Sequence, residues 1–224
     1  MHDLYEILDE IRRRKWCDYR PLREMKFGPL ILEPDREVNV MVVTEGPNRI
    51  EKPEIIASLA NYPTYHYLST LFGGKFRPLK NANAYWTHLR KCYIKDDSGR
   101  SLISSSDDKK AIKICKKYLK HEIKAVQPDL ILSVGGRVLS FLRSISSKED
   151  RKKLKGNIKD IFMKNEGIIG NVRLSNIGLE KEVKIAVVPH PSGRSTFFVD
   201  LSMEEKEKVA RILEKVKSEI LGAI

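Results

Sequence analysis

Short runs of apolar residues alternate along this chain with longer segments in which apolar residues recur every three or four positions. The short runs are rich in Val, Ile and Leu and predict buried strands, whereas the longer segments predict helices with one apolar face. Strands are expected at 38–43, within 84–94, at 129–134 and at 183–188. Helices are expected at 3–15, in part of 54–72 with an interruption at Pro63, from Asp107 to Val126, at 137–144 and at 203–221.

The ends of these segments carry signals of their own. Asp107 and Asp108 are expected to cap the basic helix that follows them, and either Asp200 or Ser202 is expected to open the C-terminal helix. Residues 146–182 are rich in Lys and Gly, have no strong pattern, and predict an irregular excursion or a hairpin. Strands that alternate with helices form βαβ units, so the sequence predicts a parallel sheet with helices on both faces.

Length and composition are those of a globular protein. The 224 residues fit a single domain over 1–224, and the 41% hydrophobic and 32% charged residues exclude a disordered chain. The longest apolar runs are far too short to span a bilayer, and the acidic, amphipathic start is not a signal peptide. With three cysteines and no export signal, the chain is expected in the reducing cytoplasm and not as a secreted disulfide scaffold.

A strong excess of positive charge suggests a polyanionic partner. The formal net charge is +12 at pH 7, and a field of that sign attracts phosphate backbones. Basic clusters at 12–15 and 151–153 add to this field locally. A solvated surface of Lys-rich helices explains the same excess equally well, so charge suggests nucleic acid without identifying a reaction.

Three turns that carry polar or ionisable groups lie at predicted strands. They are residues 44–48 after the first strand, 87–92 around the second and 190–194 after the last. Taken alone, a Glu after a strand is more often a helix cap, and His-Pro-Ser is more often an ordinary turn. Because the carboxyl ends of parallel strands meet at one edge, where such sheets bind ligands, the three turns together predict a site.

In order and spacing, these segments resemble those of the iron–sulfur (family 4) uracil-DNA glycosylases over almost the whole chain. Residues 44–48 (Thr-Glu-Gly-Pro-Asn) keep the Glu and the Pro of the family's Gly-Glu-Ala-Pro-Gly loop. Residues 85–92 (Tyr-Trp-Thr-His-Leu-Arg-Lys-Cys) are similar to the family's Tyr-Ile-Thr-Asn-Val-Val-Lys-Cys, and residues 190–192 match its His-Pro-Ser motif. The resemblance implies an α/β fold, a three-layer α/β/α sandwich with a short, mostly parallel central sheet.

The resemblance also implies a mechanism in which the target nucleotide is flipped out of DNA and its base is cut from the sugar. In that mechanism Glu45 stabilises positive charge on the sugar or positions the attacking water, and His190 stabilises the departing base. The residues implied in base binding are Gly46, Pro47, Asn48, Tyr65 and His88. The residues implied in DNA binding are Ser192, Gly193, Arg194 and Ser195.

One departure from the family concerns base recognition. The family reads uracil with an Asn amide, which offers one donor and one acceptor, whereas this chain has His88 in that place. A histidine has a different geometry and can carry charge, so hypoxanthine, a mismatch-derived base or no base at all are left open beside uracil.

A second departure concerns the cofactor. The family binds a [4Fe–4S] cluster through four cysteines, which begin with a Cys-x-x-Cys-Pro-Leu motif. In this chain Cys17 begins that motif, Arg20 replaces its second cysteine, and Cys92 and Cys115 are the remaining thiols. If a cluster is bound, these three cysteines are its ligands, and the alternative is three buried structural thiols. No cofactor is expected, because an arginine cannot supply the missing ligand.

These features predict a monofunctional DNA N-glycosylase of base-excision repair, a monomer that acts on uracil or a related deaminated base. A catalytically weak or inactive nucleic-acid-binding member of the same superfamily is the rival prediction. Retention of Glu45 and His190 favours the enzyme, whereas His88 and Arg20 favour the rival. A nucleotide-binding doubly wound module fits less well, because no Gly-x-Gly-x-x-Gly or Walker loop follows a predicted strand.

Overall fold

A five-stranded sheet forms the centre of the protein. In the computed structural model, residues 2–13, 29–47, 63–92, 94, 101, 103–179, 181–191 and 201–224 are described. The strands are β1 (Val40–Thr44), β2 (Tyr85–His88), β3 (Leu130–Val134), β4 (Ile168–Arg173) and β5 (Glu182–Val188).

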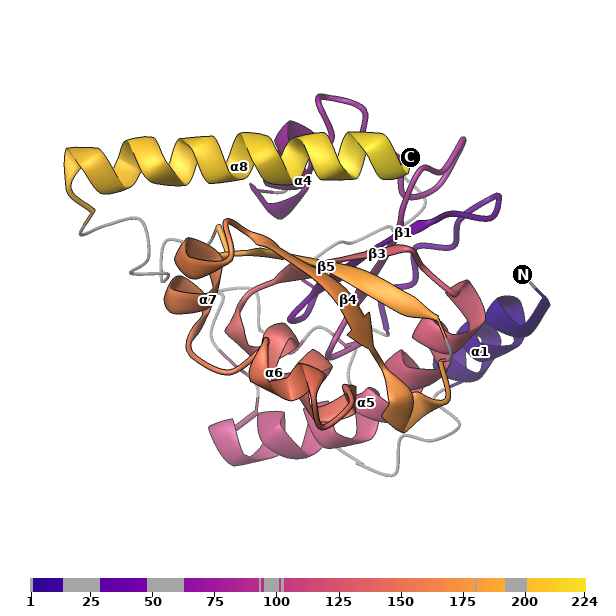
Figure 1. Ribbon diagram of the computed structural model, residues 1–224. Coiled ribbons are helices and arrows are strands. Elements are labelled where there is room, and N and C mark those ends of the chain that lie inside the picture. Colours follow the sequence, from indigo (N-terminus) through magenta and orange to yellow (C-terminus); the bar gives the residue numbers. More distant parts are fainter. Residues whose placement is uncertain are drawn as a thin grey trace.

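The order of the strands across the sheet is β2-β1-β3-β5-β4. β1, β2, β3 and β5 run parallel to one another, whereas β4 runs antiparallel along β5 at the edge of the sheet (Figure 1). The mostly parallel sheet that the alternation of strands and helices predicts is therefore confirmed.

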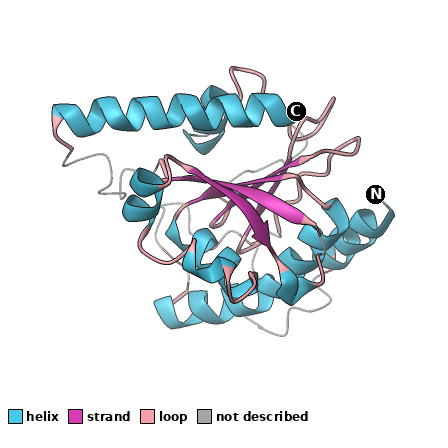
Figure 2. Ribbon diagram, in the orientation of Figure 1, coloured by secondary structure: helices cyan, strands magenta, loops and turns pink. Residues whose placement is uncertain are grey.

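Helices cover both faces of this sheet. They are α1 (His2–Arg12), α4 (Pro63–Leu71), α5 (Ser105–Val126), α6 (Gly136–Ile145), α7 (Ile158–Lys164) and α8 (Met203–Ala223), with short 3-10 turns η1 (Asp150–Lys152) and η2 (Ser175–Ile177). α4 and α8 lie over one face, and α1, α5 and α6 lie over the other, which is the predicted three-layer arrangement (Figures 1 and 2). None of the described helices combines the length and the apolarity needed to cross a membrane.

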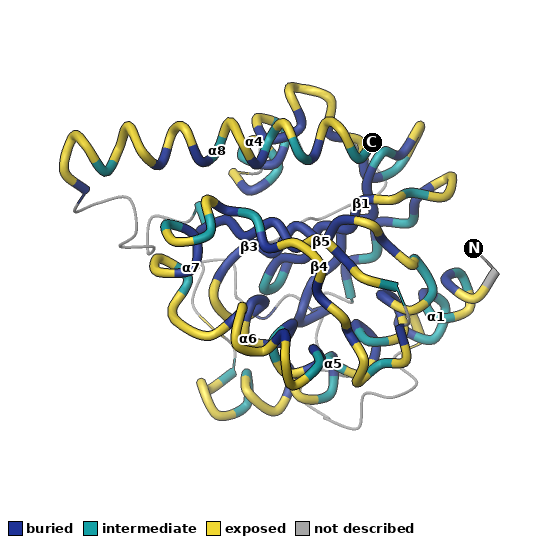
Figure 3. The backbone as a smooth tube through the Cα atoms, in the orientation of Figure 1, coloured by how far each residue is buried: buried dark blue, intermediate teal, exposed yellow. Residues whose placement is uncertain are grey.

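Alternate residues of each strand enter two separate cores. In β1, Met41 and Val43 pack with residues of α1, α5 and α6, whereas Val40 and Val42 pack with residues of α4 and α8. All four side chains are fully buried, and the sheet is the most buried part of Figure 3. Burial on both faces explains why this strand is a continuous apolar run in the sequence, with no alternation of polar and apolar residues.

Two helices begin with serine caps. Ser104 caps α5, because its Oγ accepts a hydrogen bond from the Asp107 N–H at 3.1 Å, and the prediction that Asp107 and Asp108 form the cap is wrong. Both carboxylates instead lie in the first turn, where they face the positive end of the helix dipole. Of the two candidates at the start of α8, Ser202 is the cap, and it forms a capping box with Glu205.

Pro63 begins α4, so a helix in the second part of the predicted segment is confirmed, whereas the interruption at Pro63 stays a prediction. A proline suits the first helical position because its fixed φ is helical and its missing N–H has no intrahelical partner there. The residues of the predicted helix before Pro63 lie outside the described part of the chain.

Residues 146–182 are more regular than the sequence indicates. β4 and β5 form the predicted hairpin, but α7, which precedes them, has only seven residues and was missed. Asn157 caps α7 by accepting a hydrogen bond from the Asp160 N–H at 2.9 Å, and Ile161 and Phe162 are buried. A helix this short shows less than two full turns of apolar periodicity, so its cap is the main signal in the sequence.

Candidate active site at the carboxyl edge of the sheet

The register of the strands brings the predicted turns to one edge of the sheet. Thr44 at the end of β1 pairs with His88 at the end of β2, and the ends of β3 and β5 also pair. Glu45 follows β1 directly, and His190 lies two residues beyond β5. Both predicted catalytic residues and the predicted base-reading residue therefore lie at the carboxyl edge.

Glu45 is held by a chain of ion pairs. Nη1 of Arg137, in the first turn of α6, lies 2.9 Å from Glu45 Oε1 and 2.7 Å from Asp108 Oδ2. Asp108 also accepts a hydrogen bond from Arg90 Nη1 at 2.6 Å. Partial burial opposes protonation of Arg137, but the hydrogen bond to Asp108 and the charges of Glu45 and Asp108 raise its pKa overall. The Glu45 side chain stays 37% exposed, so its carboxylate is fixed and still open to a ligand.

Gly46 leaves no room for a side chain in the turn after β1. A Cβ atom added there would lie 2.5 Å from Arg90 Nη2. Hydrogen bonds fix the position of Arg90. Its backbone N–H donates to the Glu45 carbonyl at 2.8 Å, and its side-chain Nε donates to the Cys92 carbonyl at 3.2 Å. The turn thus packs against a buried guanidinium, and Pro47, the next residue, is buried as well.

His190 is a half-buried histidine within the field of a carboxylate. Burial lowers the pKa of His190 below 6.5, and the negative charge of Glu45 opposes part of that shift. The imidazole is therefore neutral at pH 7 and carries one N–H donor. Gly135 lies beside it: a Cβ atom there would lie at an ordinary contact distance, 3.6 Å from His190 Cβ, and the φ of +96° at Gly135 is what favours glycine at this position.

His88 is fully buried, and among the described residues neither of its ring nitrogens has a hydrogen-bond partner. Burial, together with the positive charges of Lys91 and Arg90, holds the pKa of His88 well below 6.5. The expectation that this histidine can carry charge is therefore corrected: it is neutral and offers one donor and one acceptor, as an Asn amide does. A buried polar group without a partner costs about 1–3 kcal/mol, and both ring nitrogens of His88 are thus able to bond to a bound group.

A buried ion pair supports the strand end that carries His88. Lys91 Nζ bonds to Glu122 Oε2, and both side chains are almost fully buried, with 3% and 1% exposed. Glu122 Oε1 also accepts hydrogen bonds from Tyr85 Oη at 2.5 Å and from Thr87 Oγ1 at 2.9 Å. This network joins β2 to α5 and was not recognised from the sequence, although Glu122 falls on the otherwise apolar face of that helix.

Comparison with known proteins identifies the family. A family model described as the uracil DNA glycosylase superfamily matches residues 33–217, a range that includes Glu45, His88 and His190. The chain belongs to the uracil-DNA glycosylase superfamily. A search of the curated proteins finds no match.

Two thiols of this superfamily member lie close to the site. Cys92 and Cys115 are both buried, and the Lys91 N–H lies 3.5 Å from Cys115 Sγ. Cys17 and Arg20 fall outside the described residues, and within the described part no three potential metal ligands come together. Because the whole chain has three cysteines, its residues do not fit a [4Fe–4S] cubane that is held by four thiolates.

Tyr65 belongs to an aromatic row that leads to His88. Its Oη donates to the Phe76 carbonyl at 3.1 Å, and its ring centroid lies 5.6 Å from that of Phe76. Phe76 lies 5.6 Å from Trp86, and Trp86 lies 5.6 Å from His88. Stacking of Tyr65 on a flipped base stays a prediction. Five further residues that the sequence predicts to contact the base or the DNA lie outside the described residues: Asn48, Ser192, Gly193, Arg194 and Ser195.

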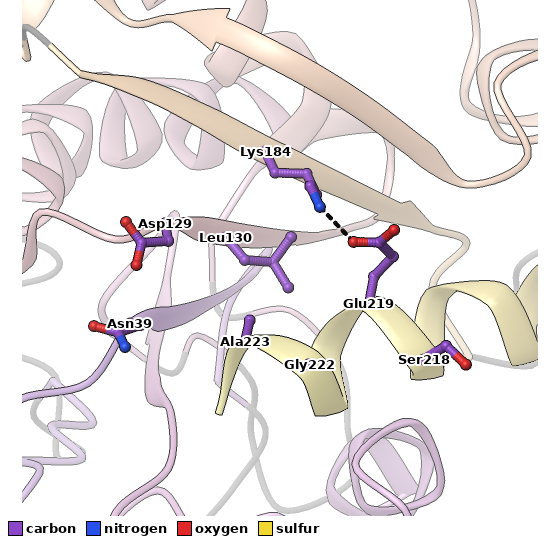
Figure 4. Close-up of a pocket in the computed structure, with 8 residues that line it drawn as sticks. All are labelled: Asn39, Asp129, Leu130, Lys184, Ser218, Glu219, Gly222 and Ala223. Carbon is purple, nitrogen blue, oxygen red and sulfur yellow. Dashed lines mark hydrogen bonds and ion pairs between the residues drawn. The ribbon is translucent and has the colours of Figure 1, made fainter.

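A separate cavity of about 500 Å³ lies at the opposite, amino edge of the sheet (Figure 4). Asn39 and Asp129, which precede β1 and β3, line one side, and the last turns of α8 line the other. Lys184 Nζ lies 2.5 Å from Glu219 Oε2, and Lys181 Nζ lies 2.6 Å from Asp129 Oδ1. The charged groups of this cavity thus pair with one another or with their neighbours.

Proposed function

We propose that this protein is a monofunctional DNA glycosylase that flips a deaminated base out of DNA and hydrolyses its N-glycosidic bond. The observation that carries the proposal is the grouping at the carboxyl edge of one sheet of Glu45, His190 and the buried His88, whose ring nitrogens have no hydrogen-bond partner among the described residues. Membership of the uracil-DNA glycosylase superfamily supports it, and so does the net charge of +12, which suits a DNA substrate.

Glu45 is suited to the sugar side of the reaction. Cleavage of the bond between sugar and base leaves positive charge on the sugar ring. A carboxylate that is oriented by Arg137 can stabilise that charge and position the water that attacks the sugar carbon. The electrons of the broken bond leave with the base.

His190 is suited to the departing base. The base leaves with negative charge on its carbonyl oxygens. A neutral imidazole donates its N–H to such an oxygen, and the interaction strengthens as the charge develops. The same group then holds the anionic base until it is protonated.

His88 is suited to reading the base. Deamination replaces an exocyclic amino group by a carbonyl oxygen, which accepts the N–H of a neutral imidazole. One such hydrogen bond does not select a single base, so we expect excision of both uracil and hypoxanthine. His88→Asn, which restores the amide of the related family, should shift the ratio of the two rates toward uracil.

Incubation with labelled duplexes that contain uracil, hypoxanthine or a mismatch, followed by alkali, tests the proposal. Strand breaks after alkali but not before it are the expected result for a monofunctional enzyme. Glu45→Gln and His190→Ala should each slow excision about a hundredfold or more while DNA affinity stays largely intact. Glu149→Gln, at an exposed carboxylate outside the site, is the matched control and should keep the wild-type rate.

Normal DNA binding with no release of any tested base would overturn the enzymatic proposal. The protein would then be a nucleic-acid-binding member of its superfamily. Equal excision rates for wild type and for the Glu45 and His190 variants would instead remove these two residues from the mechanism.

A further inference from the structure

Two neighbouring hollows follow α6 away from the candidate active site. Each has a volume of about 520 Å³, and Ser140 on α6 lines both, so they adjoin at that residue. The first begins at Glu45 and lies between α5 and α6, and the second lies between α6 and η1. Seven cations line the pair of hollows: Arg151, which bonds to backbone carbonyls, and six that are called the cationic track below, Lys109, Lys116, Arg137, Arg143, Lys152 and Lys155.

The positive charge of the cationic track is largely uncompensated. Glu45 is the one carboxylate that lines either hollow in the described part of the chain, and it already pairs with Arg137. The other five cations of the track form no ion pair with a described residue, whereas the neighbouring Lys153 pairs with Asp150 at 2.6 Å. Like charges that gather without counter-charges raise the local potential and attract an anionic partner.

The far end of the track is held in place by Arg151. Its Nε donates to the Ser146 carbonyl at 3.2 Å and its Nη2 to the Ser144 carbonyl at 3.4 Å. These carbonyls are at the C-terminal end of α6, where a cation also stabilises the helix dipole. η1 is thereby fixed against α6, so Lys152 is presented by an ordered backbone.

The dimensions and the chemistry of the track suit a nucleic-acid backbone. α6 has ten residues and is about 15 Å long, a length over which one DNA strand presents more than one phosphate. Leu89 and Ile112 are the apolar residues that line the hollows, and both belong to the first one. An acidic protein would be expected to require a larger apolar centre for a stable interface, so a phosphodiester chain is favoured.

We propose that the cationic track binds the sugar–phosphate backbone of one DNA strand beside the flipped nucleotide, and so extends the DNA contact from Glu45 to η1. The inference rests on the proposed DNA substrate. It adds a second surface to the edge that holds the target base, and it does not require that the bond cleavage occurs.

The test is the salt dependence of binding to an undamaged labelled duplex, measured by fluorescence anisotropy. Arg143→Gln combined with Lys152→Gln removes two track charges that play no part in the bond cleavage. If each contacts one phosphate, the log–log slope of affinity against salt should become shallower by about 1.8, with a clear loss of affinity at low salt. The control, Lys206→Gln with Arg211→Gln, removes the same charge from exposed positions of α8 on the other face of the sheet. It should change neither the salt slope nor the affinity at low salt.

If the track variant has the same salt slope and the same DNA affinity as the wild type, the proposal that the track binds DNA is wrong. An equal loss in both variants would also overturn it, because the effect would then be that of net charge alone. If the wild-type protein binds no DNA at all, the proposed function is wrong as well. Failure of the track alone, by contrast, leaves DNA binding by the wild-type protein intact. Protection of Lys116 and Lys152 from an amine-modifying reagent by DNA, in the wild-type protein, is expected independently of any variant, and unchanged modification would contradict the track.

Discussion

The Arg137 guanidinium reaches across the sheet edge to the Glu45 carboxylate, with Nη1 2.9 Å from Oε1, although the two residues are 92 positions apart in the chain. Half of the Arg137 side chain is exposed, so the pair adds little to the stability of the fold. Its effect lies in orientation, because Asp108 holds the same nitrogen from the other side. In the proposed mechanism, Arg137 is therefore a positioning residue for Glu45.

Arg137→Gln should slow excision about tenfold, because a carboxylate that is free to rotate spends less time in the productive geometry. The measurement is the single-turnover rate at saturating DNA, so that weaker binding does not enter. In a protein that already carries Glu45→Gln, Arg137→Gln should slow excision hardly any further, since the two residues act as a unit. Fully additive losses would show that Arg137 acts elsewhere, and Arg137→Lys should recover part of the rate.

His88→Phe should stabilise the free protein by about 1 kcal/mol and abolish excision. The substitution removes two buried nitrogens that have no partner among the described residues, and it keeps an aromatic ring beside Trp86. Thermal unfolding and the excision assay measure the two effects. A loss of stability comparable to that of an ordinary core substitution would show that His88 is a structural residue.

The body of the sheet could be predicted from the sequence because its strands are buried on both faces. β1 and β3 are almost wholly apolar, β5 ends in the apolar run 185–188, and each is followed by a turn with Gly, Pro or His. A parallel sheet then requires that these turns share an edge, which is how Glu45 and His190 could be placed together without coordinates.

What the sequence does not show are the contacts between distant segments. The ion pair of Arg137 with Glu45 and that of Lys91 with Glu122 join residues 92 and 31 positions apart, and neither has a local pattern. The charge state of His88 depends on burial and on two neighbouring cations, so a rule based on residue type alone gave the wrong expectation.

The stability of the protein should fall as the pH drops below 6.5, and His88 should account for much of the fall. Its folded pKa is depressed, so below pH 6.5 the unfolded chain binds a proton that the folded chain does not. That difference corresponds to a slope of about 1.4 kcal/mol per pH unit. His190 is shifted in the same direction and adds a smaller amount, because it is partly solvated.

Denaturant unfolding between about pH 7 and pH 5 measures this slope, in a range that lies above the ordinary pKa values of carboxylates. His88→Phe should make the dependence on pH clearly shallower. A wild-type stability that is constant over this range would contradict the buried, neutral state of His88.

Removing one partner of the Lys91–Glu122 pair should lower the free energy of unfolding strongly, whereas replacing both partners by apolar residues should lower it much less. Glu122→Gln leaves Lys91 as a buried charge without its carboxylate, and we expect a loss of about 3–5 kcal/mol of unfolding free energy. Lys91→Met combined with Glu122→Leu removes both charges and should recover much of that loss. In the control, Glu219→Gln breaks the more exposed pair with Lys184 and should cost less than about 1 kcal/mol. Similar losses of unfolding free energy in all three variants would contradict the prediction that breaking the buried pair costs more than breaking the exposed one.

The purified protein should contain no iron and should be colourless. Three cysteines cannot close a cubane that takes four thiolates, and the guanidinium of Arg20, which replaces the fourth, stays protonated and cannot become a ligand. Metal analysis and the visible spectrum of protein that is purified without oxygen make the measurement. Arg20→Cys supplies the missing thiolate, so iron uptake by this variant on reconstitution would show that the remaining cysteines are suitably placed. Stoichiometric iron in the wild-type protein that is lost in Cys92→Ala or Cys115→Ala would contradict the prediction, and it would mean that a group other than cysteine completes the cluster.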